Sequence, residues 1–217
     1  MTTSSLELAS LLCSRLCHDM LSPVGALSNG LELLADEKDP EMRQRCFELL
    51  DQSARISADK LKFFRLAFGA AGGFGELLAV NEARVLVDAL VANNARITLN
   101  WALASDSLPK HAIKTLLNLA LIGIEALPRG GTLDIAAERR GEGAGMVSEI
   151  VVRAAGLRIA FDRDIGCALD GSLPEGELSS RTAPAAMVNQ LAQAQGGNLQ
   201  YALAEGALVL GAVLPGA

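Results

Sequence analysis

The chain has 217 residues and a formal net charge of −6, and 50% of its residues are hydrophobic although only 4% are aromatic. This length and hydrophobic content support a buried aliphatic core, which excludes an intrinsically disordered protein. The acidic balance lacks the basic surface with which proteins bind nucleic acids or anionic membranes, so we expect neither partner. The longest uncharged stretch, residues 182–204, contains Pro184 and several Asn and Gln residues, and it is therefore not a membrane span.

The four cysteines form no CxxC pair, and neither of the two histidines stands at a metal-ligand spacing from them. The sequence therefore predicts no metal site. The first nine residues lack the positive segment and apolar run of a signal peptide. Together with the free thiols, this favours a cytoplasmic protein.

Two long helices are predicted first. In residues 5–35, apolar or small residues recur in steps of four and three, as they do again from residue 42 to about residue 68. Asp39 and Pro40 provide an N-cap and a first-turn proline for the second helix. The seam consists of Ala9, Cys13, Leu16, Met20, Pro23, Leu27, Gly30 and Leu34 in the first helix, and Met42, Cys46, Leu49, Ser53, Ile56, Lys60, Phe63 and Ala67 in the second. A hairpin buries this seam on one side only, so we expect a homodimeric four-helix bundle.

The glycine-rich segment 69–75 ends the second helix and predicts a boundary between residues 1–75 and residues 76–217. Beyond it, helices and strands alternate. Helices are predicted at 81–93, 110–127 and 184–195, and strands at 96–104, 132–138, 147–154, 157–161, 199–204 and 207–214. The fold class is therefore α plus α/β, with a helical hairpin followed by a two-layer sandwich on a mixed sheet.

His18 faces away from the seam of the first helix, because it is rotated by about 200° from Leu16. Its side chain is expected to be exposed. Six residues are predicted on the same face: Ser14, Arg15, Leu21, Ser22, Gly25 and Asn29. Leu21 is apolar and exposed, and Gly25 costs about 1 kcal/mol in a helix relative to Ala. Both features fit a face on which another protein docks, or they are tolerated defects beside an ordinary surface histidine.

The string from Cys17 to Val24 resembles the H-box of dimerisation and histidine-phosphotransfer domains in two-component signalling. An exposed imidazole can accept a phosphoryl group and pass it onward. Asp19 can hold one ring nitrogen through its proton and leave the other as the nucleophile. Pro23 removes a backbone hydrogen bond and is expected to bend the helix. Ser22, one turn from His18, is placed to position a water, or is a plain surface serine.

Residues 116–132 and 187–199 resemble parts of the Bergerat-like ATP-binding domain of histidine kinases and gyrase-type ATPases. In those relatives a second Asn, four residues after the position of Asn118, holds the Mg²⁺ of the nucleotide. Here that position is Ile122, which cannot ligate a hard cation. Residues 164–168 keep only part of the first glycine box. Pro184 and neighbouring alanines stand where the second should open a helix, so no bound nucleotide is expected.

This combination is similar to the ChpT-type histidine phosphotransferases of alphaproteobacteria, and the similarity includes the string Lys62-Phe-Phe-Arg-Leu-Ala-Phe-Gly69. The resemblance implies that His18 is the phosphorylated residue of a dimer. It implies transfer from the receiver of a CckA-like hybrid kinase to CtrA-like and CpdR-like response regulators, with Mg²⁺ supplied by the receiver. It implies that the C-terminal domain serves architecture and docking. Phe64 is adjacent to Phe63 and cannot share its face, so we expect it to pack on the second domain or to contact a receiver.

Two other functions stay open at this point. The chain can be an autophosphorylating histidine kinase with an atypical ATP site, or a non-catalytic adaptor that sequesters a receiver on the Leu21 and Gly25 face. Among the remaining residues, His111 is expected at the surface, Trp101 in the core, and the thiols of Cys13 and Cys17 in packing roles.

Overall fold

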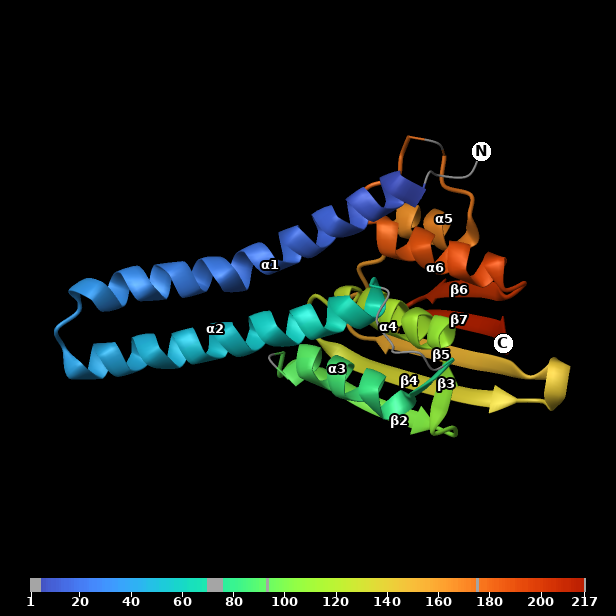
Figure 1. The fold of residues 1–217 in the computed structure, drawn as a ribbon, viewed down its shortest axis with the longest axis horizontal. Coiled ribbons are helices and arrows are strands. Elements are labelled where there is room, and N and C mark those ends of the chain that lie inside the picture. The colour runs from blue at the N-terminus through green and yellow to red at the C-terminus, as the bar shows by residue number, and fades with distance from the viewer. Residues whose placement is uncertain (1–4, 70–75, 93, 175, 217) are drawn as a thin grey trace.

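The computed structural model describes residues 5–69, 76–92, 94–174 and 176–216. Two long antiparallel helices, α1 (Ser5–Asp36) and α2 (Pro40–Ala67), form a hairpin that projects from an α/β body (Figure 1). Both predicted helices are therefore confirmed, with bounds within a residue or two of those expected.

The turn of the hairpin is held by side-chain contacts that the sequence predicts in part. The backbone N–H of Met42 donates to Oδ2 of Asp39 at 3.4 Å, so Asp39 is the N-cap of α2, with Pro40 in the first turn. The Arg43 guanidinium donates to the carbonyl oxygens of Leu34 and Glu37, which are at the end of α1 and just beyond it. These contacts satisfy carbonyls that a helix end leaves without partners.

The hairpin seam is buried where α1 and α2 run side by side. Pro23 and Gly30 of α1 and Cys46 and Ser53 of α2 are buried. A Cβ on Gly30 would lie 2.9 Å from Cδ2 of Leu50, so the two helices approach closely there. Towards its N-terminus, α1 diverges from α2 and lies against α6 (Figure 1).

The divergence corrects part of the predicted seam. Ala9 and Cys13 are exposed rather than buried. Leu8 is buried instead, in a small cluster with Ala183 and Met187. The apolar pattern of the seam continues to the N-terminus of α1, but there α1 packs against α6 instead of α2.

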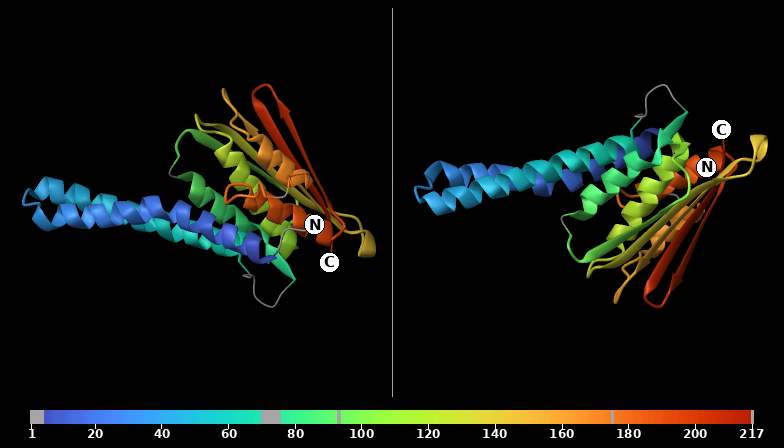
Figure 2. Two further views of the ribbon diagram at one scale, coloured as in Figure 1. Left: turned by 90° about the horizontal axis from the view of Figure 1, so that it is seen from above. Right: turned by 90° about the horizontal axis from the view of Figure 1, so that it is seen from below.

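The α/β body is a two-layer sandwich (Figure 2), as predicted. Its mixed sheet has the order β2-β4-β5-β7-β6, with β2 and β4 parallel and the other neighbours antiparallel. Its helices cover one face, and buried residues alternate with more exposed ones along β4, β5 and β7. The elements are β1 (Leu77–Ala79), α3 (Val80–Ala92), β2 (Ile97–Leu103), β3 (Ser107–Pro109), α4 (Lys110–Glu125), β4 (Gly131–Arg140), the 3₁₀ turn η1 (Gly143–Gly145), β5 (Val147–Ala155), α5 (Arg163–Asp170), α6 (Ala183–Ala194), β6 (Asn198–Ala204) and β7 (Ala207–Pro215).

Three details differ from the prediction. The strand predicted at 157–161 is wrong, because this segment is irregular and joins β5 to α5. Helix α5 was not predicted, although Asp162 caps its N-terminus and Gly171, in the left-handed region, ends it. A two-stranded sheet of β1 and β3 was also missed; each of its strands has three residues.

The base of the hairpin belongs to the core of the α/β body. Phe63, Phe64, Leu66 and Ala67 at the end of α2 join one buried cluster with α3, α4 and the sheet. The predicted boundary falls on residues 69–75, and residues 70–75 of it lie outside the described residues. In the described part of the chain, no helix is both long and apolar enough to cross a membrane.

Candidate phosphoacceptor site

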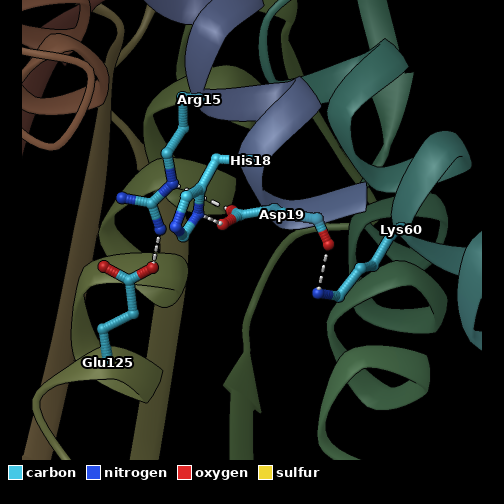
Figure 3. Close-up of polar contacts among 5 residues, drawn as sticks. All are labelled: Arg15, His18, Asp19, Lys60 and Glu125. Atoms are coloured by element: carbon cyan, nitrogen blue, oxygen red, sulfur yellow. Dashed lines mark hydrogen bonds and ion pairs between the residues drawn. The ribbon is translucent and has the colours of Figure 1, made fainter. Parts of the chain in front are cut away.

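His18 lies in the middle of α1, on the side that faces α4, where the hairpin meets the body (Figure 3). Its side chain is 80% exposed, as the rotation away from the seam predicts. An imidazole held at this degree of exposure can meet a large partner without any rearrangement of the helix.

Asp19 fixes one edge of the His18 ring. Nδ1 of His18 lies 3.1 Å from Oδ1 of Asp19, so the predicted contact between these side chains is present. The carboxylate favours a proton on Nδ1, which leaves the Nε2 lone pair free. The other carboxylate oxygen, Oδ2, accepts a hydrogen bond of 2.8 Å from Nε of Arg15.

Arg15 is not the exposed docking residue that the sequence predicts. Its side chain is buried, and its Nη2 donates to Oε1 of Glu125, the last residue of α4. The helical rotation alone could not show this, because the flank of α1 that carries Arg15 is covered by α4. Burial tends to lower the pKa of Arg15, but the charges and hydrogen bonds of Glu125 and Asp19 outweigh it and raise that pKa above its usual value. Burial raises the pKa of Glu125, against the opposing effect of Arg15.

Lys60 of α2 completes the group from the other side (Figure 3). Its Nζ donates to the backbone oxygen of Asp19 at 2.8 Å. That carbonyl would normally accept from the N–H of residue 23, but Pro23 has none. The lysine therefore replaces the helical hydrogen bond that the proline removes.

The other predicted residues of the α1 face lie at increasing distance from His18 along the helix. Leu21, Ser22 and Asn29 are exposed. A Cβ added to Gly25 would meet nothing within 4 Å, so packing within this chain does not require a glycine there. Asn29 lies about 17 Å from His18 along the axis, beside a hollow that is also lined by Glu32, Leu33, Asp36 and Glu37.

Phe64 is the second corrected docking residue. Its ring is buried, packs edge-on against Phe63 with centroids 5.6 Å apart, and stacks on Phe68 at 5.0 Å. Of the two expectations for Phe64, packing on the second domain is confirmed and contact with a receiver is wrong, because this end of α2 lies in the core of the body.

The residues that resemble a nucleotide-binding site pack against other parts of the chain. Asn118 is fully buried, and its Nδ2 donates to the carbonyl oxygens of Ala67 at 3.3 Å and Lys114 at 2.8 Å. Ile122 is also buried. Gly166 of the partial glycine box lies against Tyr201, because a Cβ there would be 2.5 Å from the phenolic oxygen. Asn118 thus joins α4 to α2, and Gly166 allows α5 to pack against β6.

The remaining predictions concern His111, Trp101 and two cysteines, and of these the prediction for Trp101 is confirmed in part. His111 is half-buried rather than at the surface, and its Nε2 lies 3.2 Å from the carbonyl oxygen of Pro215. Trp101 packs against the core from its edge, and its Nε1 donates to Asp88. Cys17, like Cys13, is exposed, so neither thiol has the predicted packing role. Among the described residues, no three His, Cys, Asp or Glu side chains are grouped so that they could hold a metal ion.

Glu125 and Lys60 are the two members of the site that the sequence analysis did not assign. Nothing in the local sequence connects Glu125 to residues 110 positions earlier. For Lys60 a signal existed, because it is a lysine in an apolar seam of a hairpin whose other helix carries an internal proline. Such a lysine is a natural donor to a carbonyl that a proline leaves free.

Comparison with known proteins gives consistent results. The sequence model of the histidine phosphotransferase C-terminal domain matches residues 80–207. Protein phosphotransferase ChpT from Brucella abortus is 43% identical over 137 residues, which are 63% of this chain and 64% of that relative. A solved structure described as a bacterial phosphotransferase is 32% identical, covers 98% of each chain and has a TM-score of 0.83. The histidine kinase AdeS from Acinetobacter baumannii is 14% identical with a TM-score of 0.47, over 91% of this chain and 97% of that one.

Proposed function

The chain belongs to the ChpT-type histidine phosphotransferase family, and on this premise we propose that it is a phosphorelay intermediate that carries a phosphoryl group on His18. The donor is the phosphoaspartate of a receiver domain, and the acceptor is an aspartate of another receiver. The observation that carries the proposal is an exposed imidazole whose Nδ1 edge is held by Asp19.

The transfer exchanges one bond for another. The Nε2 lone pair of His18 forms a bond to phosphorus, the bond between phosphorus and the aspartyl oxygen breaks, and its electron pair stays on the carboxylate of the donor. The Nδ1 proton remains on the ring, where Asp19 accepts its hydrogen bond and stabilises the positive charge that develops. Onward transfer to the second receiver reverses these steps.

The Mg²⁺ used by phosphoaspartate chemistry would come with the receiver. Asp19 and Glu125 are the carboxylates linked to His18, and both are engaged by the Arg15 guanidinium. They are therefore poor candidates for a resident metal, which requires several free oxygen ligands. In the proposed complex, Leu21 provides an apolar anchor beside His18, and Gly25 allows a close approach of the partner backbone.

The nearest alternative is an ATP-dependent histidine kinase. Burial of Asn118 beneath the end of α2 and an apolar side chain at Ile122 argue against it, because a nucleotide would need polar groups that face an open site. We propose instead that the α/β body supports the hairpin and takes part in docking. The proposed partners are the receivers of a CckA-like hybrid kinase and of CtrA-like and CpdR-like regulators, in the cytoplasm.

One labelling experiment separates these functions. The purified chain is mixed with a ³²P-labelled phosphorylated receiver or with labelled ATP alone, and His18→Ala is the matched control. We expect an acid-labile, base-stable label on the wild type from the receiver and none from ATP. Labelling by ATP alone would indicate a kinase. Equal labelling of the His18→Ala chain would overturn the proposal, and tight receiver binding without any transfer would indicate an adaptor.

A further inference from the structure

Glu125, at the end of α4 in the α/β body, is linked to the phosphoacceptor through two residues. Its Oε1 accepts from Nη2 of Arg15, Nε of Arg15 donates to Oδ2 of Asp19, and Oδ1 of Asp19 lies beside Nδ1 of His18. We propose that Glu125 is a positioning residue for phosphotransfer, which sets the orientation of the His18 ring through Arg15 and Asp19. This inference rests on the proposed function of His18.

Asp19 and Arg15 each contact two partners through different atoms. Asp19 uses one oxygen for the histidine and the other for the arginine, so its carboxylate plane is fixed only while both contacts are made. Arg15 likewise uses Nε for Asp19 and Nη2 for Glu125. A planar guanidinium can make two such contacts in fixed directions, whereas the single ammonium of a lysine cannot.

The surroundings make Glu125 necessary to Arg15. The Arg15 side chain is only 11% exposed, and a buried guanidinium needs more than one acceptor to offset its lost hydration. Glu125 is the last residue of α4, a helix with no basic residue in its last turn. A cation from α1 is therefore favourable at this negative helix end, in addition to its pairing with the carboxylate.

The consequence is that the α/β body acts on the chemistry of the hairpin. Without Glu125, Arg15 keeps one acceptor and can swing away from Asp19, so the His18 ring loses a fixed partner at Nδ1. Orientation of a reacting group within about 1 Å is worth up to about a hundredfold in rate. We expect a loss of about tenfold, because Asp19 itself stays in place.

The test measures the reactivity and the tautomer of His18 in the full chain. Phosphoramidate serves as the phosphoryl donor, because it needs no docking surface; Nε2 attacks its phosphorus and ammonia leaves. The fraction of His18 with the proton on Nδ1 is read from ¹⁵N NMR shifts. The variants are Glu125→Ala and Glu125→Asp. The matched control is Asp134→Ala, which removes a carboxylate of similar exposure, 38% against 36%, from an ion pair with Arg153 on the sheet.

We expect Glu125→Ala to lower the labelling rate about tenfold and to lower the Nδ1–H fraction, with Glu125→Asp intermediate. Asp134→Ala should change neither quantity. Wild-type labelling by Glu125→Ala, or slow labelling with an unchanged tautomer, would overturn the inference. If circular dichroism shows that Glu125→Ala does not fold, the decision rests on Glu125→Asp. A wild-type labelling rate in Glu125→Asp would then overturn the inference.

Failure of the proposed function gives a different result. In that case wild-type His18 takes no label from phosphoramidate or from a phosphorylated receiver. The tautomer comparison between wild type and Glu125→Ala still decides whether Glu125 positions the ring.

Discussion

At the scale of single residues, the site is built from contacts that compensate for local deficits. Pro23 leaves the Asp19 carbonyl without its helical donor, and Lys60 supplies one from α2. Arg15 loses hydration, and two carboxylates replace it. Rotation around a helix predicts that His18 is exposed, and the chemistry of an H-box predicts that Asp19 contacts its ring. It does not show that Arg15 is covered, because that depends on a helix more than ninety residues later in the chain.

The compensation by Lys60 can be measured as a double-mutant cycle. Lys60→Met removes a charge-assisted hydrogen bond, so we expect the free energy of unfolding in urea to fall by about 1 kcal/mol. In a Pro23→Ala background, the backbone N–H of residue 23 can bond the Asp19 carbonyl, and Lys60→Met should cost less than half as much.

Lys62→Met is the control for the loss of a lysine from α2, because its Nζ pairs with Asp59 on the surface at 3.3 Å. It should cost under about 0.5 kcal/mol in both backgrounds. If the effects of Lys60→Met and Pro23→Ala simply add, the lysine does not replace the missing hydrogen bond.

His111 predicts a pH dependence of stability. Burial lowers its pKa below that of a free histidine, although its hydrogen bond to the Pro215 carbonyl opposes this shift. Below the unfolded-state value of about 6.5, the unfolded chain takes up a proton that the folded chain resists. The free energy of unfolding therefore falls as the pH drops from about 7 towards 5.

The contribution of His111 is isolated by comparison with His111→Gln, whose amide can also donate to Pro215 but does not titrate. The unfolding free energy of both proteins is measured in urea at several pH values. As the pH falls, that of the wild type should decrease more than that of His111→Gln. A difference that is constant from pH 5 to pH 7 would show that His111 is not responsible.

At the scale of elements, the sequence predicts the long helices, in which signals at the ends coincide with a periodic pattern, but it misses the short α5 despite Asp162 and Gly171 at its ends. Asp39 and Pro40 mark the start of α2, and a three-and-four pattern extends through α1. The strand predicted at 157–161 fails for a physical reason. Leu157, Ile159 and Phe161 alternate as in a strand, but Leu157 points fully into solvent and β4 and β5 already have neighbours on both edges. Alternation shows which side chains are apolar, but it does not show whether a partner strand is available.

The divergence of α1 from α2 makes the N-terminal part of α1 dependent on α6. Leu8 is 7% exposed in the cluster with Ala183 and Met187, whereas Leu6 on the same helix is 77% exposed. We expect Leu8→Ala to lower the free energy of unfolding by about 2 to 3 kcal/mol, through lost burial and a residual cavity. Leu6→Ala should change it by less than about 0.5 kcal/mol. Equal effects of the two substitutions would mean that α1 is not anchored on α6 in solution.

At the scale of the whole molecule, the hairpin leaves part of its own seam uncovered. Met42 and Leu49 occupy seam positions of α2, yet both are exposed, and Leu31 of α1 is exposed as well. One hairpin has only two helices, and a closed apolar core needs further helices around it. The predicted four-helix bundle with a second copy would cover these side chains, and the bundle remains a prediction.

The bundle can be tested by the oligomeric state in solution. Light scattering should give a mass of about twice the 22.7 kDa of one chain. Leu49→Lys, which introduces a charge at the uncovered edge of the seam, should shift the protein to the monomer mass, because an unpaired charge in an apolar interface is costly. The control is Phe47→Lys on the same helix. Phe47 is 50% exposed, against 40% for Leu49, but it is rotated from Leu49 by about 200° and therefore faces away from the seam. A wild-type monomer, or dissociation by both substitutions alike, would contradict a bundle built on the seam.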